Sequence, residues 1–277
     1  MARNFNELLG KKWDEGKFLC VGLDSELGKI PESARKGGTT ETILAFNKAI
    51  IDATHDLVCA FKPNSAFYEA HGEEGWQALR ETILYIRSVS PEVPVILDAK
   101  RADIGNTNNG YVTAFFDDLK CDAVTVHPYL GAEAIQPFLD RKDKGVIVLC
   151  RTSNPGAKEF QDLEMSGEPL YKVVAKHVKE KWNTNGNCGL VVGATYPNEL
   201  REVRAVVGDI PFLMPGIGAQ GGDLEASAKA GKDSRGKGMI INASRAVIFA
   251  SASADFAGAA RTKVQEYDGI IRKALIE

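Results

Sequence analysis

Asp98, Lys100 and Asp103 lie close together in the segment Asp98–Thr107, which reads Asp-Ala-Lys-Arg-Ala-Asp-Ile-Gly-Asn-Thr. The segment follows Val93–Leu97, an apolar run rich in β-branched residues that is typical of a buried parallel strand. Asp98 and Lys100 are two residues apart, so on a strand their side chains point to the same face. A carboxylate, an ammonium and a second carboxylate, Asp103, shift one another's proton affinities, which is typical of functional sites. The alternative is an ion-pair network that caps the strand, although buried charge pairs stabilise folds only weakly.

A second segment that could do chemistry is rich in glycine. Pro215–Asp223 reads Pro-Gly-Ile-Gly-Ala-Gln-Gly-Gly-Asp. Glycines let the backbone approach an anion, and free N–H groups at the start of the next helix can bind it. Arg245 could add a guanidinium to the same phosphate. The segment matches G-x-G-x-x-G, but a dinucleotide site needs that pattern in the first strand-to-helix turn. The sequence therefore favours a phosphate site, with a tight turn that needs glycine as the alternative.

Other common catalytic chemistries have little support in the sequence. The four histidines lack the spacing of metal ligands, and we interpret His127 as structural. No G-x-S-x-G motif is present to support a Ser-His-acid triad. The five cysteines include no C-x-x-C pair and mostly lie in or beside apolar runs. This usage predicts buried, reduced thiols and no metal site.

Composition limits the class of protein. The chain has 277 residues, of which 44% are hydrophobic and 26% charged, and its net charge is −3. These values are ordinary for a globular enzyme and give no reason to expect nucleic acid or an anionic membrane as a partner. No apolar run reaches ~18 residues, and Met1–Lys17 lacks the apolar core of a signal peptide. We therefore expect a cytoplasmic protein.

Eight apolar, strand-like runs recur about 31 residues apart, which is the spacing of a strand–loop–helix unit. They are Phe18–Leu23, Leu57–Phe61, Val93–Leu97, Ala123–Val126, Val146–Leu149, Gly189–Val192, Pro211–Met214 and Met239–Ile241. The stretches with helical periodicity are 4–15, Thr40–Thr54, Glu73–Val89, Asn108–Leu119, Ala132–Leu139, Pro169–Trp182, Pro197–Val207, Asp223–Ala230 and Arg261–Ile276. This alternation predicts a single α/β domain over residues 1–277, a (β/α)8 TIM barrel. An open doubly wound sheet is the alternative.

Polar residues follow nearly every one of these strands. They are Asp24, Lys62, Asn64, Asp98, Lys100, His127, Arg151, Thr152, Ser153, Asn242, Ser244 and Arg245, and the run Pro211–Met214 is followed by Pro215-Gly216. In a TIM barrel the carboxyl ends of the strands face the active site. One polar strand end could simply be solvated, but a ring of them is hard to explain by packing. The segment Arg151–Gly167 is long for such a loop and is either a mobile lid or a decorated surface loop.

On these residues the chain resembles the orotidine 5′-phosphate decarboxylase family, in its longer bacterial branch. The most specific motif is D-x-K-x-x-D-I-x-x-T, which runs from Asp98 to Thr107. Phe-Lys-Pro-Asn around Lys62, the glycine-rich segment and Arg245 support the resemblance. It implies a homodimeric barrel with shared active sites that converts orotidine 5′-monophosphate to uridine 5′-monophosphate (UMP) and CO2. This is the last step of de novo pyrimidine synthesis and uses no metal and no cofactor.

The resemblance also implies a role for each matching residue. Lys100 would deliver a proton to C6, and Asp98 would lie against the substrate carboxylate. Asp24 and Lys62 would hold the ribose hydroxyls, with Lys62 also pairing with Asp98. The other implied positions are Asp103 and Thr107, which would reach into the neighbouring subunit's site, Ser153 on the pyrimidine, and Pro215, Gln220 and Arg245 around base and phosphate. One departure is Asn-Ala-Ser before Arg245, where many members have Val-Gly.

Two other functions fit the same residues. A Schiff-base aldolase on a phosphate-binding barrel would use Lys100 or Lys62 as its nucleophile. The flanking carboxylates argue against it, because they favour the charged ammonium, which cannot attack a carbonyl. A nucleotide-binding barrel without activity would require Lys100 to be inert.

Overall fold

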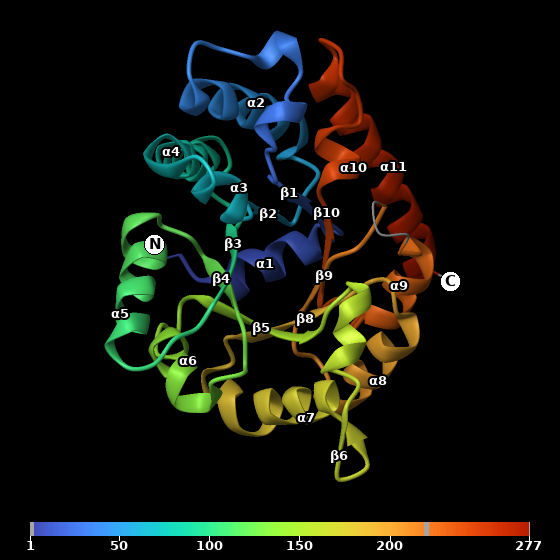
Figure 1. Ribbon diagram of the computed structural model, residues 1–277. Coiled ribbons are helices and arrows are strands. Elements are labelled where there is room, and N and C mark those ends of the chain that lie inside the picture. The colour runs from blue at the N-terminus through green and yellow to red at the C-terminus, as the bar shows by residue number, and fades with distance from the viewer. Residues whose placement is uncertain (1–2, 219–221, 277) are drawn as a thin grey trace.

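The predicted barrel is present in the computed structural model, which describes residues 3–218 and 222–276. Eight parallel strands follow one another in the order β2-β1-β10-β9-β8-β5-β4-β3 (Figure 1). The two strands at the ends of this order also meet, because parallel bridges join Phe61 to Val95 and Asn64 to Asp98. The sheet therefore closes on itself, with helices around it. The (β/α)8 prediction is confirmed, and the open-sheet alternative is wrong.

Each predicted strand overlaps an observed one. The barrel strands are β1 (Leu19–Gly22), β2 (Ala60–Lys62), β3 (Ile96–Arg101), β4 (Ala123–Val126), β5 (Gly145–Arg151), β8 (Cys188–Val192), β9 (Phe212–Met214) and β10 (Met239–Ala243). The main differences are in β2 and β3, which begin at residues 60 and 96 instead of the predicted 57 and 93. Pro94 has no N–H to donate to a ladder, so β3 starts after it. The shift places Asp98 and Lys100 inside the strand.

The helices also match the predicted stretches closely. They are α1 (Phe5–Asp14), α2 (Thr39–Thr54), α3 (Ala66–Glu69), α4 (Gly72–Val89), α5 (Asn106–Val112), α6 (Gly131–Leu139), α7 (Leu170–His177), α8 (Pro197–Val207), α9 (Leu224–Gly231), α10 (Arg245–Ile248) and α11 (Phe256–Ile276). α3 and α10 are short additions that the periodicity did not indicate. Within the described residues, no helix has the length and apolar character needed to cross a membrane.

Helix α1 covers the amino-terminal end of the barrel. The Trp13 indole donates a hydrogen bond of 2.7 Å to the carbonyl of Met239, the first residue of β10. Phe5 packs on Gly145, the first residue of β5, where a Cβ atom would lie 2.4 Å from the Phe5 ring. This end is therefore filled by side chains. The opposite end, where the strands finish, is the one that remains available for a site.

Two connecting segments, one after β5 and one at 231–238, have defined structure. The segment after β5 contains a 3-10 turn at Pro155–Glu159 and a small antiparallel ladder between β6 (Glu164–Met165) and β7 (Glu168–Pro169). In the segment 231–238, the buried carboxylate of Asp233 accepts hydrogen bonds from the backbone N–H groups of Arg235 and Lys237. That segment precedes β10, so it closes the barrel at the end away from the candidate site. All five cysteines are buried and free, as predicted.

Candidate active site

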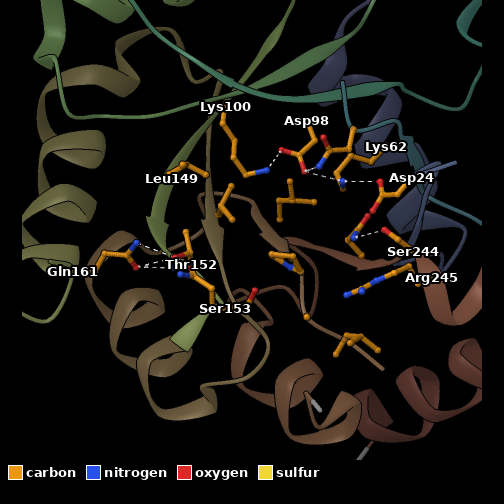
Figure 2. Close-up of a pocket in the computed structure, with 18 residues that line it drawn as sticks. Asp24, Lys62, Asp98, Lys100, Leu149, Thr152, Ser153, Gln161, Ser244 and Arg245 are labelled. Atoms are coloured by element: carbon orange, nitrogen blue, oxygen red, sulfur yellow. Dashed lines mark hydrogen bonds and ion pairs between the residues drawn. The ribbon is translucent and has the colours of Figure 1, made fainter. Parts of the chain in front are cut away.

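A cavity of about 500 Å³ opens at the carboxyl ends of the strands. It is lined by residues of β2, β3, β5, β8, β9 and β10, and by loop residues at the carboxyl ends of the strands, among them Asp24 after β1 (Figure 2). The predicted site residues that line it are Asp24, Lys62, Asp98, Lys100, Ser153, Pro215 and Arg245. Figure 2 shows Ser153, Thr152 and Gln161 on one side of the cavity and Asp24, Ser244 and Arg245 on the other. The site therefore has two separate walls.

Asp98 is the centre of the polar network. Its Oδ2 lies 2.9 Å from Lys62 Nζ, and its Oδ1 lies 2.6 Å from Lys100 Nζ. The Thr125 hydroxyl donates a third hydrogen bond, 2.9 Å long, to Oδ1. Burial raises the pKa of the Asp98 carboxyl, but the two ammonium groups outweigh burial and hold that pKa well below its usual range. Asp98 is therefore a carboxylate at any pH at which the protein would work.

Lys62 is the buried member of the network, with a side chain only 3% exposed. Burial lowers the pKa of its ammonium, but Asp98 and then Asp24, whose Oδ1 lies 3.9 Å from Lys62 Nζ, raise it above its usual value. Lys62 consequently stays charged although it is enclosed. Lys100 differs, because its side chain is 49% exposed and reaches into the cavity. The two lysines thus share one carboxylate and both line the cavity, with Lys100 far more exposed than Lys62.

The backbone at Lys100 departs from an ordinary strand. Its φ angle is +48°, a region that residues other than glycine rarely adopt. The register between β3 and β4 shifts between Leu97 and Arg101 at the same place. The Lys100 N–H donates a 2.9 Å hydrogen bond to Thr125 Oγ1, which stabilises this conformation. Such backbone strain costs about 1–3 kcal/mol and is often found where a side chain must be aimed.

The remaining predicted residues fall into two groups. Asp103 and Thr107 do not line the cavity of their own chain. Asp103 Oδ1 instead accepts a hydrogen bond of 2.7 Å from the N–H of Ile104, and Thr107 is exposed. Gln220 lies outside the described residues. His127 follows β4 but does not line the cavity, and its ring contacts backbone atoms of Ala102 and Tyr129, which fits a structural role.

The comparisons with known proteins identify the family. Residues 17–260 match the Orotidine 5'-phosphate decarboxylase / HUMPS family. An orotidine 5'-phosphate decarboxylase of Cupriavidus metallidurans is 53% identical over 93% of both chains. One from Cellvibrio japonicus is 51% identical over 93% of this chain and 94% of that protein. The solved structure of Leishmania donovani OMP decarboxylase is 41% identical, has a TM-score of 0.83, and covers 97% of this chain and 99% of its own. The chain belongs to this family.

Arg151 was expected at the site of this decarboxylase fold, but the structure buries its side chain behind the cavity wall. Its Nε lies 2.9 Å from Asp162 Oδ1, and its guanidinium stacks 4.5 Å from the centre of the Tyr196 ring. Its Nη1 also donates to the Thr152 carbonyl at 3.1 Å. Asp162 belongs to the long loop after β5. The charged strand end therefore ties this loop to the barrel, and Arg151 is not a ligand-facing group.

The loop that Arg151 anchors carries Ser153 and Gln161 into the cavity. Ser153 lies so close to Gly193, after β8, that a Cβ there would come within 2.8 Å of it. The Thr195 hydroxyl donates to the Ser153 carbonyl at 3.3 Å, and the Gln161 carboxamide oxygen accepts from the Thr152 N–H at 2.8 Å. These contacts fix one wall of the decarboxylase cavity before any ligand enters.

Sequence reasoning missed two residues of the site. Thr125 holds Asp98 and the Lys100 backbone, and its signal was a single hydroxyl in the otherwise apolar strand Ala123–Val126. Gln161 gave no signal, because its position depends on the path of the 15 residues between Arg151 and Gly167. Within the described part of the chain, no group of three or more His, Cys, Asp or Glu side chains is arranged to hold a metal ion.

Replacing Asp98 tests the central network. Asp98→Asn leaves Lys62 and Lys100 facing each other without a carboxylate, so we expect a loss of about 3 kcal/mol in the free energy of unfolding at pH 7. The folded chain lowers the pKa of Asp98 below about 3.9, its unfolded value. Its stabilisation is therefore present above that pH and is lost as the pH falls below it. Urea unfolding should show the gap between wild type and Asp98→Asn narrowing from pH 7 to pH 3.

A matched control is Asp118→Asn, which breaks an exposed pair with Arg80 and should cost only about 0–1 kcal/mol. The proposed network would be contradicted if Asp98→Asn lowered the free energy of unfolding as little as this control does. It would also be contradicted if the loss for Asp98→Asn were equal at pH 7 and pH 3.

The Arg151 anchor gives a second prediction. Asp162→Asn removes the carboxylate partner of a fully buried guanidinium, so we expect a loss of about 1–3 kcal/mol in stability. We also expect faster limited proteolysis within residues 152–169 and a higher KM, because Ser153 and Gln161 lose their support. Glu159→Gln, an exposed carboxylate on the same loop, is the control. Equal proteolysis rates in the two variants would contradict the anchoring role.

Proposed function

We propose that this chain decarboxylates orotidine 5′-monophosphate with Lys100 as the proton donor and Asp98 and Lys62 as its fixed electrostatic partners. The overall reaction follows from the family and from relatives that are about half identical, and it forms UMP in pyrimidine biosynthesis. The assignment of residues rests chiefly on one observation. Lys100 Nζ lies 2.6 Å from a buried carboxylate and projects into a cavity that also contains Asp24, Ser153 and Arg245.

In the proposed step, the bond between C6 of the pyrimidine and its carboxylate carbon breaks. The carboxylate leaves as CO2, and the electron pair remains on C6. Lys100 places a positive charge beside this carbanion and then transfers a proton to C6 to give UMP. Solvent reprotonates Lys100. No group is oxidised or reduced in this step, so the residues named here supply all of the required proton chemistry.

The size of the barrier shows why a lysine alone is insufficient. No adjacent carbonyl delocalises an electron pair at C6, so the enzyme must supply an acceleration near the upper end of the known range, about 20 kcal/mol. One preorganised donor contributes about 3–4 kcal/mol. The remainder must come from binding energy at the ribose and phosphate, which fixes the ring against Lys100. We therefore expect many favourable contacts between the protein and the ribose and phosphate of the substrate.

Arg245 is suited to the phosphate part of this grip. It is exposed at the cavity, and its guanidinium forms no hydrogen bond or ion pair with another described residue. A guanidinium without a carboxylate partner is available to pair with two phosphate oxygens. Pro215 and Gly216 line the cavity beside it, and the proposed contact of Gln220 belongs to the same segment. Across the cavity, Ser153 is assigned to the pyrimidine.

We place Asp103 and Thr107 in the site of a partner subunit of a homodimer. Both lie outside the cavity of their own chain. The loop that carries them also exposes an apolar group, Ile104, which is 60% exposed. The adjoining loop after β4 exposes Tyr129 (87%) and Leu130 (43%). These three exposed apolar side chains lie near Asp103, whose carboxylate does not line the cavity of its own chain. Such a surface is suited to burial against a second copy of the chain.

The Schiff-base alternative has less support. Asp98 and Asp24 raise the pKa of Lys62, so this lysine stays an ammonium, which is not a nucleophile. The named relatives are decarboxylases. We also propose that residues 1–277 act as one catalytic domain, because α1 and α11 pack on the same hydrophobic core. Five buried, free thiols fit the reducing cytoplasm.

Removing the Lys100 amine tests the chemical assignment. Lys100→Met should lower kcat by at least about 10⁴-fold, because it removes both a fixed charge and a proton donor. UMP should still bind within about tenfold of wild type. Turnover is measured from the loss of orotidine 5′-monophosphate absorbance, and a chelator should leave the wild-type rate unchanged. Lys142→Ala, an exposed lysine before β5, is the control. A Lys100→Met rate close to that of this control would refute the assignment.

Mixing two inactive variants tests the shared site. A heterodimer of Lys100→Ala and Asp103→Ala chains contains one site with an intact lysine and an intact partner aspartate. Random exchange at equal amounts should restore about a quarter of the wild-type activity. A Lys100→Ala chain mixed with Asp24→Ala should restore none, because both residues line the cavity of the same chain. Subunit exchange without recovery in the first mixture would contradict the position of Asp103.

A further inference from the structure

Asn242 carries a buried hydrogen-bonding atom that the protein does not use. The residue lies in β10, is 6% exposed and lines the cavity. Its Nδ2 donates a 3.3 Å hydrogen bond to Ser244 Oγ. Its Oδ1 is buried and has no hydrogen-bond partner among the described residues. Buried amide oxygens are almost always paired, because an unpaired one loses its hydration without compensation.

The neighbouring strand β1 supplies a second atom of the same kind. The Asp24 Oδ1 atom is also buried without a hydrogen-bond partner, and its nearest cation, Lys62 Nζ, is 3.9 Å away. β1 and β10 pair in parallel, with Cys20 opposite Asn242. A Cβ on Gly22 would lie 3.3 Å from Asn242 Oδ1 and 1.8 Å from Ser244 Oγ. Asn242 and Ser244 therefore lie against the end of β1, just before Asp24.

These two oxygens define what a ligand must offer at this wall. Both are acceptors, so the missing partners are hydrogen-bond donors. A phosphate dianion has no proton to donate, and the pyrimidine is assigned to Ser153, on the opposite wall (Figure 2). A ribose carries two hydroxyls on adjacent carbons and can donate to both oxygens. Because Gly22 has no side chain, Ser244 Oγ can lie beside β1 and accept the hydrogen bond from Asn242 Nδ2.

We propose that Asn242 is a further substrate contact whose carboxamide oxygen accepts a hydrogen bond from a ribose hydroxyl, next to the one that Asp24 accepts. The inference rests on the proposed function and extends it, since it makes this wall a discriminator between ribonucleotides and deoxyribonucleotides. A ligand that lacks the hydroxyl leaves a buried oxygen without a hydrogen-bond donor, so it should bind more weakly than the ligand that carries the hydroxyl. Asn242 does not touch the reacting atoms.

Binding of UMP, 2′-deoxy-UMP and 3′-deoxy-UMP to the dimer, measured by calorimetry, tests this contact without requiring turnover. Wild-type protein should bind one or both deoxy ligands about 10- to 100-fold more weakly than UMP. Asn242→Ala should bind UMP itself about tenfold more weakly than wild-type protein does. For one of the deoxy ligands, the loss of affinity relative to UMP, which we call the deoxy penalty, should shrink in this variant to less than about threefold. Ser244→Ala, which frees the carboxamide, should lie between wild type and Asn242→Ala.

The control is Asn198→Ala, an exposed asparagine on α8 outside the cavity, which should keep the full penalty. An undiminished penalty in Asn242→Ala, with UMP binding intact, would overturn the inference alone. Wild-type protein that bound no UMP would overturn the proposed function and this inference together. Should Asn242→Ala not fold, wild-type protein still decides the matter, because equal binding of all three nucleotides refutes the contact.

Discussion

The site depends on one carboxylate that is shared between two ammonium groups. Asp98 binds Lys62 with one oxygen and Lys100 with the other, and Thr125 donates a third hydrogen bond. Burial alone would favour the neutral acid, so the ionised state is maintained by the two cations. Lys62 is almost fully buried, although it also lines the cavity. It neutralises part of the buried charge of Asp98, and Lys100 is left with half of its side chain exposed to the cavity.

The barrel provides this geometry through the pairing of β2, β3 and β4. Lys62 ends β2, Asp98 lies within β3, and Thr125 lies within β4, so each strand contributes one group to the same layer. The positive φ angle at Lys100 occurs where the β3–β4 register shifts. Thr125 binds the Lys100 N–H there and compensates for a lost ladder contact. The local irregularity is therefore what directs the lysine towards the cavity.

Much of this arrangement could be predicted from the sequence. The eight-fold alternation determined the barrel, and the strand ends identified Asp24, Lys62, Asp98 and Lys100, because parallel strands deliver their last residues to one end. The prediction was wrong for Arg151, since a polar strand end can turn behind the wall and pair with a distant loop residue such as Asp162. Such a pairing depends on the path of the loop, which periodicity does not encode. The positive φ angle at Lys100 was also missed, because hydrophobic periodicity does not encode a local register shift within a strand.

The two walls of the cavity differ in the groups that they leave facing it. On the side of Ser153, the buried Arg151–Asp162 pair and the contact with Gly193 hold the loop in place. On the other side, the described residues leave Asp24 Oδ1 and the Arg245 guanidinium without hydrogen-bond partners. In the proposed binding mode, the non-reacting ribose and phosphate of the substrate meet these groups. This distribution is the one that catalysis requires, because tight interactions remote from C6 can hold the ring against Lys100 without stabilising the carboxylate that must leave.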